Sequence, residues 1–174
     1  MDRTLWHWFV AHRPAWLVDV AKALAFIGDE TVLLPLTLLV AAAAVLRGRR
    51  TVAAVAPFVA MFSTAAVVAV SKAAFGRVRP PAAERLVEVG SASMPSGHAA
   101  YAAALAAVVW LAVADHPRHR AFRALSVALA AAAGLSRMVL GVHWASDVLV
   151  GWALGAAAAF CVVRVLGRRL QSPR

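Results

Sequence analysis

Two kinds of residue are scarce in this 174-residue chain: cysteine, which occurs once, and acidic side chains, which number 8 against 18 Lys and Arg. The single Cys161 excludes an intramolecular disulfide and a metal site built from cysteines. Because it lies within an apolar run, we interpret it as a small buried hydrophobe. The opening residues also lack the basic start, continuous apolar stretch and cleavage site of a secretory signal, so membrane insertion would depend on the apolar segments themselves.

Apolar residues are abundant instead, at 63% of the chain, and the mean hydropathy is positive. A soluble domain seldom reaches this level, so the composition predicts an integral membrane protein. A net charge of +10 is also typical of nucleic-acid binding proteins. Here, however, the basic residues gather between apolar runs, at 47–50, at 117–120 and near the C-terminus. Such clusters are typical of cytoplasmic loops, and we expect no nucleic-acid partner.

Five apolar runs are long enough, with their flanks, to cross a membrane as helices. They are 32–46, 52–70, 99–114, 122–133 with an extension towards 140, and 148–166. A sixth run, 15–27, is shorter and contains Asp19 and Lys22, so it either crosses the membrane or lies in the interface, anchored by neighbouring tryptophans. We expect it to cross. The predicted fold is therefore all-α, a single domain over 1–174 that forms an integral membrane bundle of six transmembrane helices.

Six crossings would place both termini on one side of the membrane. The basic clusters near the N-terminus, at 47–50, at 115–123 and at the C-terminus would share that side, which the positive-inside rule identifies as cytoplasmic. The polar stretches 28–31 and 73–97 would then face outside. We therefore expect a multi-pass protein of the plasma membrane, with cytoplasmic termini and an extracytoplasmic active site.

Small residues in the apolar runs indicate close helix packing. Gly151 and Gly155 are four residues apart, so they share one face of a helix. Their partner is either another helix of the same bundle, which we favour, or a second copy of the chain. The oligomeric state is left open by the sequence.

Two polar clusters come together at the outer end of the predicted bundle. The first, KAAFGRVRP at 72–80, begins where an apolar run ends and closes with a proline. Its cations are Lys72, Arg77 and Arg79. The second, SMPSGH at 93–98, places Ser96 and Gly97 at the start of a helix, where unpaired N–H groups and the helix dipole attract anions. Taken alone, this cluster equally fits a plain serine cap.

The third cluster is SRMVLGVHWASD at 136–147, between two apolar runs. His143 and Asp147 are four residues apart, so on a helix the carboxylate can accept the imidazole N–H and orient the ring. Arg137 lies just upstream, at the end of the preceding run. An isolated His–Asp pair is usually structural, but ionisable groups at a membrane face indicate function by default.

Together the clusters supply three kinds of group at one face: cationic donors, an anion-binding corner and two imidazoles. They are Lys72, Arg79 and Arg137, then Ser96 and Gly97, then His98 and His143. Cations around such a corner suit phosphate oxygens. Two histidines suit a displacement in which one attacks phosphorus and the other protonates the leaving oxygen. The combination predicts phosphoryl transfer to water.

The three clusters resemble the three-part signature of the type 2 phosphatidic acid phosphatase superfamily. Lys72 is followed by six residues and then Arg79-Pro80, and the second part is Pro95-Ser96-Gly97-His98. The third part is Ser136-Arg137, five residues, His143, three residues and Asp147. Order and spacing match over 72–147, and the surrounding apolar runs fit the six-helix bundle of that family.

The resemblance implies a role for each matched residue. His143 would be the nucleophile that forms a phosphohistidine, Asp147 would orient it, and His98 would act as general acid and then as base. The phosphate would be held by Lys72, Arg79, Arg137, Ser96 and the backbone N–H of Gly97. The family needs no metal or cofactor, because its cationic side chains take that place.

We therefore expect a lipid phosphatase whose partners are the bilayer and a lipid phosphate, in the undecaprenyl-diphosphatase-like or phosphatidylglycerophosphatase-like branch. Polyprenyl diphosphate is the first choice of substrate. Phosphatidic acid, phosphatidylglycerol phosphate and a polyprenyl-linked sugar phosphate are alternatives. Two alternatives belong to other classes of protein. A transporter would distribute its polar groups through the membrane depth, whereas here they gather at one end. A non-catalytic lipid-phosphate binding protein would not need the two histidines, and both are present.

Several charged residues and histidines lie outside the signature. The first group either contacts the lipid head group or solvates the loop, and we favour the second role: Arg77, Glu84, Arg85 and Glu88. We place the second group on the cytoplasmic side and exclude it from the site: His7, His12, His116 and His119.

Overall fold

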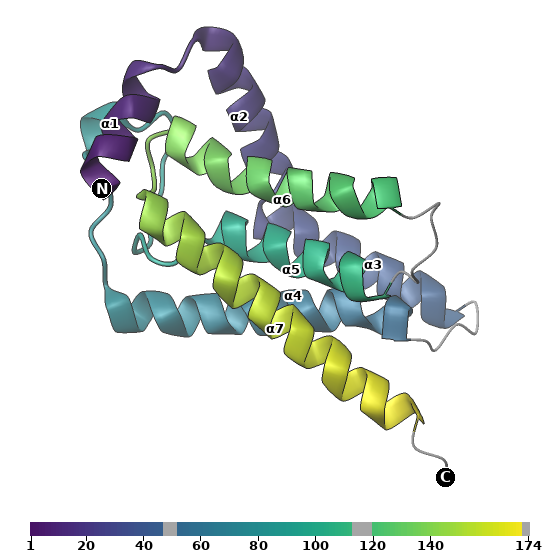
Figure 1. Ribbon diagram of the computed structural model, residues 1–174. Coiled ribbons are helices and arrows are strands. Elements are labelled where there is room, and N and C mark those ends of the chain that lie inside the picture. The colour runs from purple at the N-terminus through teal and green to yellow at the C-terminus, as the bar shows by residue number, and fades with distance from the viewer. Residues whose placement is uncertain (47–51, 113–119, 172–174) are drawn as a thin grey trace.

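The computed structural model of this chain describes residues 1–46, 52–112 and 120–171 (Figure 1). Every regular element in these ranges is helical, as the apolar runs predict. The elements are α1 (Asp2–Ala11), α2 (Ala15–Ile27), α3 (Glu30–Leu46), α4 (Val52–Phe75), the short 3-10 helix η1 (Ala82–Glu84), α5 (Gly97–Ala112), α6 (Arg120–Val139) and α7 (Ala145–Gln171). The helices α3 to α7 run between the two ends of a bundle, with α7 crossing the others obliquely.

Three helices in the described ranges are long and apolar enough to cross a membrane: Ala54–Phe75 of α4, Arg120–Val139, and Ala145–Leu166 of α7. Shorter apolar segments, Glu30–Leu39 of α3 and Gly97–Leu111 of α5, lie alongside them. Four of the predicted runs thus coincide with helices throughout their described length, and 122–133 is extended at both ends into α6.

Large apolar side chains lie on the outside of these helices. Phe62 is 66% exposed and Leu149 is 60% exposed, which would be unfavourable in water and is expected where a helix faces lipid. Cys161 also lies on this surface, exposed on α7. This corrects the interpretation of Cys161 as buried, because an apolar run in a membrane helix has a lipid-facing side as well as a core side.

The structure also corrects the prediction that 15–27 crosses the bundle. Just before α2 begins, the guanidinium of Arg13 donates to the carbonyl of Glu84 at 2.8 Å. Near the end of α2, the carbonyl of Ala25 accepts a hydrogen bond from His98 at 2.9 Å. Glu84 and His98 belong to the same end of the bundle, so α2 lies across that end (Figure 1). Its 13 residues span only about 20 Å, less than the ~30 Å of a hydrocarbon core.

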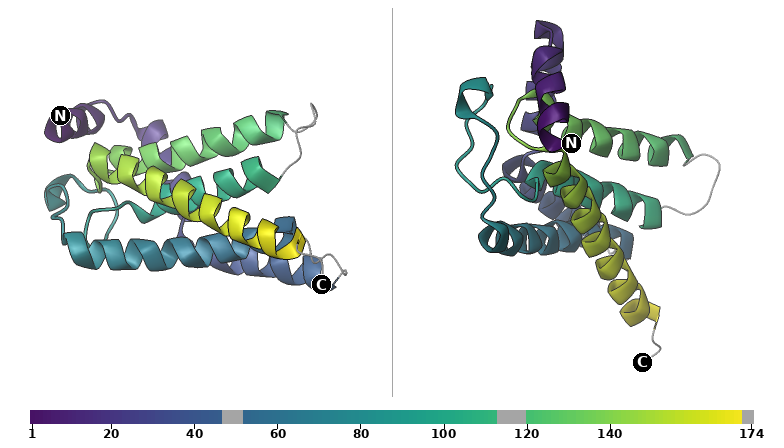
Figure 2. Two further views of the ribbon diagram at one scale, coloured as in Figure 1. Left: turned by 60° about the horizontal axis from the view of Figure 1, so that its bottom comes forward. Right: turned by 60° about the vertical axis from the view of Figure 1, so that its left-hand side comes forward.

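The first helix lies at this end too. The backbone N–H of Ser146, at the start of α7, donates to Asp2 Oδ1 at 2.9 Å, and the indole of Trp6 donates to the carbonyl of Gly141 at 3.2 Å. The last turns of α7 lie at the opposite end of the bundle (Figures 1 and 2). The N-terminal helix and the last described turns of α7 therefore lie at opposite ends of the bundle, whereas the sequence predicts termini on one side of the membrane. The basic cluster at 47–50 and most of that at 115–123 fall outside the described residues.

The approach of α7 to α5 positions the site. A Cβ atom on Gly155 would lie 1.9 Å from the carbonyl oxygen of Ala100, and one on Gly151 would lie 2.5 Å from that of Ser96. Only glycine permits such contact between two helices. This confirms that the glycine pair serves packing within the bundle. As a result, the start of α7, which carries Asp147, is held against the start of α5.

Candidate active site

A cavity of about 580 Å³, which we call the site cavity, opens at the end of the bundle where α4 and α6 end and α5 begins. Six of the eight residues singled out by the sequence line it: Lys72, Arg79, Gly97, His98, Arg137 and His143. The other two, Ser96 and Asp147, are fully buried next to it. The three sequence clusters therefore meet at one place, although 75 positions separate the first of these residues from the last.

His143 lies in the turn between α6 and α7, with its ring between a cation and a carboxylate. Its Nε2 is 3.2 Å from Nη1 of Arg79, and its Nδ1 is 3.4 Å from Oδ2 of Asp147. A guanidinium can only donate, so Nε2 carries the lone pair and Nδ1 carries the proton that faces the carboxylate. Burial lowers the pKa of His143 to about 4, and the charges of Arg79 and Arg137 act in the same direction. The hydrogen bond to Asp147 raises the pKa but does not outweigh them. The ring is therefore neutral near pH 7, with a nucleophilic nitrogen beside a cation.

The turn that places His143 depends on Gly141. This residue has φ of 74°, a conformation that favours glycine, and a Cβ here would lie 2.6 Å from the carbonyl oxygen of Glu84. The backbone N–H of Val142 then donates to the carbonyl of Arg137 at 3.1 Å, which folds the chain back over the end of α6. His143 and Arg137 thereby reach the same cavity.

Asp147 is held by several donors. Its Oδ2 accepts from Ser93 Oγ at 2.5 Å and from the backbone N–H of Trp144 at 2.8 Å, and its Oδ1 accepts from Arg77 Nη1 at 2.6 Å. The contact with Trp144 is half of a capping box, because Asp147 is the third residue of α7 and reaches back to the residue before the helix. The carboxylate is therefore fixed in orientation as well as in charge.

Arg77 is a functional candidate that the sequence interpretation missed. Its guanidinium joins Asp147 to Asp2, with 2.7 Å between Nη2 and the Asp2 Oδ2, and its side chain is only 29% exposed. Asp2 also accepts from the Ser146 hydroxyl at 2.5 Å. Partial burial raises the pKa of Asp2, but the hydrogen bonds from Ser146 and Arg77 lower it below its ordinary value. No local pattern could reveal this chain of contacts, since 75 positions separate Asp2 from Arg77.

The cations of the site cavity differ in how many hydrogen bonds they make to the protein. Lys72 donates to Ser91 Oγ at 2.7 Å, and Arg79 donates to the carbonyls of Ser91 at 2.7 Å and Val142 at 2.9 Å. Arg137, only 5% exposed, has no hydrogen-bond partner for its Nε among the described residues. The same holds for Oγ of the buried Ser96. Buried polar groups without partners are costly, and a bound oxyanion would satisfy the unpaired Arg137 donor in this cavity.

His98 lines the site cavity from the start of α5. Its Nε2 lies 2.9 Å from the carbonyl oxygen of Ala25 and 3.7 Å from Oδ2 of Asp29. Both neighbours can only accept, so Nε2 carries a proton and Nδ1 is the nitrogen left to exchange a proton with a ligand. Three carboxylates also line the cavity, those of Asp29, Glu30 and Glu88.

The remaining histidines and loop charges lie apart from this chemistry. His7 and His12 are at the same end of the bundle, contrary to the expected topology, but both are exposed and neither lines the site cavity. Glu84 pairs with Arg13 at 2.9 Å, and Arg85 donates to the carbonyl of Pro80 at 2.8 Å. His116 and His119 fall outside the described residues. Among the described residues, no group of three or more His, Cys, Asp or Glu side chains is arranged to hold a metal ion.

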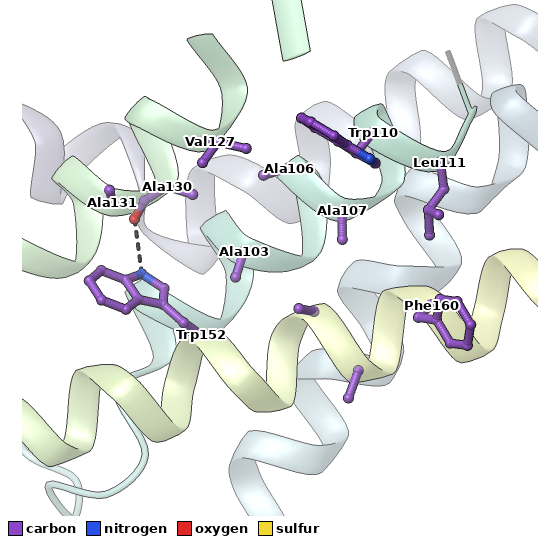
Figure 3. A pocket seen from close by; sticks show the side chains of 12 residues that line it. Ala103, Ala106, Ala107, Trp110, Leu111, Val127, Ala130, Ala131, Trp152 and Phe160 are labelled. Carbon is purple, nitrogen blue, oxygen red and sulfur yellow. Dashed lines mark hydrogen bonds between the residues drawn. The ribbon is translucent and has the colours of Figure 1, made fainter. Parts of the chain in front are cut away.

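A second cavity, of about 860 Å³, lies between α5, α6 and α7 (Figure 3). Its lining consists of alanine, valine, leucine, phenylalanine and tryptophan side chains. Trp152 crosses from α7 to α6 and donates to the carbonyl of Ala130 at 3.0 Å. This cavity offers no titratable group, so the chemistry belongs to the smaller site cavity.

Known proteins are similar to this chain in sequence and in architecture. Residues 53–171 match the family model described as PAP2 superfamily. The chain is 31% identical over 155 residues to phosphatidylglycerophosphatase B of Bacillus subtilis (strain 168), covering 86% of this chain and 75% of that protein.

Two solved structures are similar as well. The transmembrane PAP2-type phosphatidylglycerolphosphate phosphatase of Bacillus subtilis has a TM-score of 0.83 and 28% identity, with 99% of this chain and 87% of that chain covered. LpxE of Aquifex aeolicus has a TM-score of 0.76 and 23% identity, with 94% of each chain covered, which is a likeness in fold.

Proposed function

This chain belongs to the PAP2 superfamily and is a membrane lipid phosphatase, and we propose that it hydrolyses its lipid substrate through attack of His143 on phosphorus. The observation that carries this proposal is the position of His143 Nε2, 3.2 Å from Arg79 in a cavity that Lys72 and Arg137 also line. A phosphate whose oxygens contact these cations has its phosphorus within reach of the imidazole lone pair. The three cations also stabilise the charge that develops on the equatorial oxygens.

The reaction has two displacements. In the first, the Nε2–P bond forms while the bond from phosphorus to the lipid oxygen breaks, and His98 gives its Nδ1 proton to that oxygen. The ring of His143 becomes positive and is stabilised by Asp147, which Arg77 and Ser93 hold in place. In the second, water attacks phosphorus, His98 takes the proton, and the N–P bond breaks to release phosphate and neutral His143.

The substrate that we favour is a phosphomonoester whose neighbouring group carries hydroxyls, of which phosphatidylglycerol phosphate is the example. Asp29, Glu30 and Glu88 line the same cavity as the cations, and their carboxylates can accept hydrogen bonds from hydroxyl groups. The similarity to phosphatidylglycerophosphatase B supports the same choice. This ranks phosphatidylglycerol phosphate ahead of polyprenyl diphosphate, the first choice from the sequence. Polyprenyl diphosphate remains the second candidate, because Lys22 also lines the cavity and is a possible partner for a second phosphate.

The membrane orientation that we propose places the site cavity outside the cytoplasm. The basic residues of the last turns of α7 lie at the opposite end, where the positive-inside rule locates the cytoplasm. With α2 lying across the outer end, the N-terminus is also outside. A cysteine at Ala82, in a Cys161→Ser background, should react with a membrane-impermeant maleimide added to intact cells, while a cysteine at Arg168 should not. The reverse pattern contradicts this orientation.

The function is tested with purified protein and a panel of lipids: phosphatidylglycerol phosphate, phosphatidic acid and polyprenyl diphosphate. His143→Ala should abolish phosphate release, because the nucleophile is lost. His12→Ala is the matched control, an exposed histidine at the same end of the bundle, and should retain full activity. Undiminished turnover in His143→Ala would refute the mechanism, and preference for the diphosphate would refute the substrate choice.

A further inference from the structure

The edge of the His98 ring that carries Nε2 faces the turn between α2 and α3. A Cβ on the buried Gly28 would lie 3.5 Å from Cδ2 of His98, so the turn packs directly on the ring. Two oxygen acceptors lie at this edge, the carbonyl of Ala25 at 2.9 Å and the carboxylate of Asp29 at 3.7 Å from Nε2. The opposite nitrogen, Nδ1, is thereby left for the ligand.

Asp29 is fixed in this position by its role as a helix cap. It precedes α3, and its Oδ1 accepts from the backbone N–H of Thr31 at 2.9 Å and from the Thr31 hydroxyl at 2.7 Å. These bonds leave Oδ2 directed at His98. Partial burial raises the pKa of Asp29, but the bonds from Thr31 and the charges of His98 and Arg137 lower it below its ordinary value. Asp29 is therefore ionised whenever the enzyme works near neutral pH.

The charges that face His98 come from three elements. Arg137 on α6 and Lys72 on α4 repel a positive imidazole, whereas Asp29 in the turn before α3 attracts it. A general acid must hold its proton until the leaving group departs. Burial of the ring and the cations that bind phosphate therefore oppose the protonated form of His98, and the carbonyl of Ala25 and the charge of Asp29 act in its favour.

We propose that Asp29 is a positioning residue for the general acid of this phosphatase, which stabilises the protonated form of His98 and directs its Nδ1 proton at the leaving oxygen. The inference rests on the proposed function. In the first displacement, the Nδ1 proton moves to the lipid oxygen as the P–O bond breaks, while the Nε2 proton stays between Ala25 and Asp29. In the second, Nδ1 recovers a proton from the attacking water. Asp29 itself exchanges no proton.

The test uses leaving groups that differ in their need for a proton. Asp29→Asn removes the charge but keeps an oxygen that can accept from Thr31. For an alkyl lipid phosphate, kcat/KM should fall about tenfold, a fraction of the ~10²–10⁴ that a general acid supplies. For p-nitrophenyl phosphate, whose leaving group departs without a proton, kcat/KM should stay within about twofold of the parent value. Retained turnover of the aryl phosphate also shows that the variant is folded.

Three further variants complete the experiment. His98→Ala should show the same dependence on the leaving group, but more strongly, and adding Asp29→Asn to it should cause little further loss of kcat/KM for the lipid. Asp19→Asn, at an exposed acid of α2, should leave both substrates unchanged. Asp29→Glu should recover part of the lipid activity because it restores the charge.

Each other outcome overturns the inference. An equal loss for both substrates in Asp29→Asn would mean that Asp29 only caps α3, and no loss would mean that its charge is irrelevant. If the loss of kcat/KM depends on the leaving group in His98→Ala but not in Asp29→Asn, only the inference about Asp29 fails. If the loss in His98→Ala does not depend on the leaving group either, the proposed mechanism fails as well. If the parent protein releases no phosphate from any lipid, the proposed function fails.

Discussion

Arg77 forms an ion pair with Asp147, with 2.6 Å between Nη1 and Oδ1, although 70 positions separate the two residues. The carboxylate is fully buried, and a buried charge is stable only with partners of opposite charge or with hydrogen-bond donors. The same carboxylate faces Nδ1 of His143. Arg77 therefore supports the orientation of the proposed nucleophile without lining the site cavity.

Replacing Arg77 by methionine should lower both the stability and the activity of the protein. The variant keeps an unbranched stem but leaves the buried charge of Asp147 without its cation, at a cost of about 2–3 kcal/mol after allowance for the partial exposure of Arg77. Thermal unfolding in detergent and kcat for the lipid measure the two effects. Arg3→Met, at an exposed arginine of α1, is the matched control, and equal behaviour of the two variants contradicts the role of Arg77.

Asp2→Asn should have a smaller effect. The amide oxygen still accepts from the backbone N–H of Ser146, but the ion pair with Arg77 is lost, and partly exposed pairs contribute only about 1 kcal/mol or less. Combined with Arg77→Met, the loss of stability should be smaller than the sum of the single losses, because both variants remove the same contact. Strict additivity in this double-mutant cycle would show that the two residues are not coupled.

The imidazole of His143 should remain neutral down to about pH 4 in the protein without substrate, because burial lowers its pKa from the ordinary 6.5. Since this pKa is lowered, the neutral form predominates above pH 4 and is lost as the pH falls through that value. NMR titration of the histidine side chains, with the signal assigned by its absence in His143→Ala, measures the midpoint directly. A midpoint near 6.5 contradicts the prediction.

The same shift affects stability. Between pH 6.5 and 4, the unfolded chain binds a proton at His143 that the folded chain does not, so the contribution of this group makes the protein less stable as the pH falls. The difference between the unfolding temperatures of the parent and of His143→Gln, measured across this interval, should shrink towards acid pH. A difference that does not change with pH would show that His143 titrates alike in both states.

Gly155→Ala should destabilise the bundle by about 2–3 kcal/mol or prevent its assembly, because the added Cβ would meet the carbonyl of Ala100 at 1.9 Å. Moving α7 away from α5 would also displace Asp147, so phosphatase activity should fall together with stability. Ala153→Val, at an exposed position of the same helix, is the control and should be tolerated. Normal stability of Gly155→Ala would show that the two helices are not in such close contact.

Much of the candidate site follows from local sequence. His143 and Asp147 are one helical turn apart, and Ser96 and Gly97 begin an apolar helix, so their neighbourhood depends on local geometry. The ends of the apolar runs then predict which clusters share a face of the membrane. For this reason the sequence predicts that residues from all three clusters lie together.

The path of α2 could not be derived in this way. Its composition suits a short membrane segment and an interfacial helix equally, and hydropathy does not distinguish them. The contacts of Arg13 with Glu84 and of Ala25 with His98 decide the matter, and both join residues more than 70 positions apart. The same correction moves the N-terminus to the end of the bundle that holds the site.

The sequence by itself determined an all-helical membrane protein and the residues available for phosphate chemistry, because the length of an apolar run and the spacing of a motif are local properties. Only the tertiary structure decided how those residues are supported. Arg77, which also pairs with Asp2, holds Asp147, and Asp29 faces His98 from the turn before α3. These partners come from distant segments whose meeting depends on the packing of helices, and no spacing along the chain encodes it.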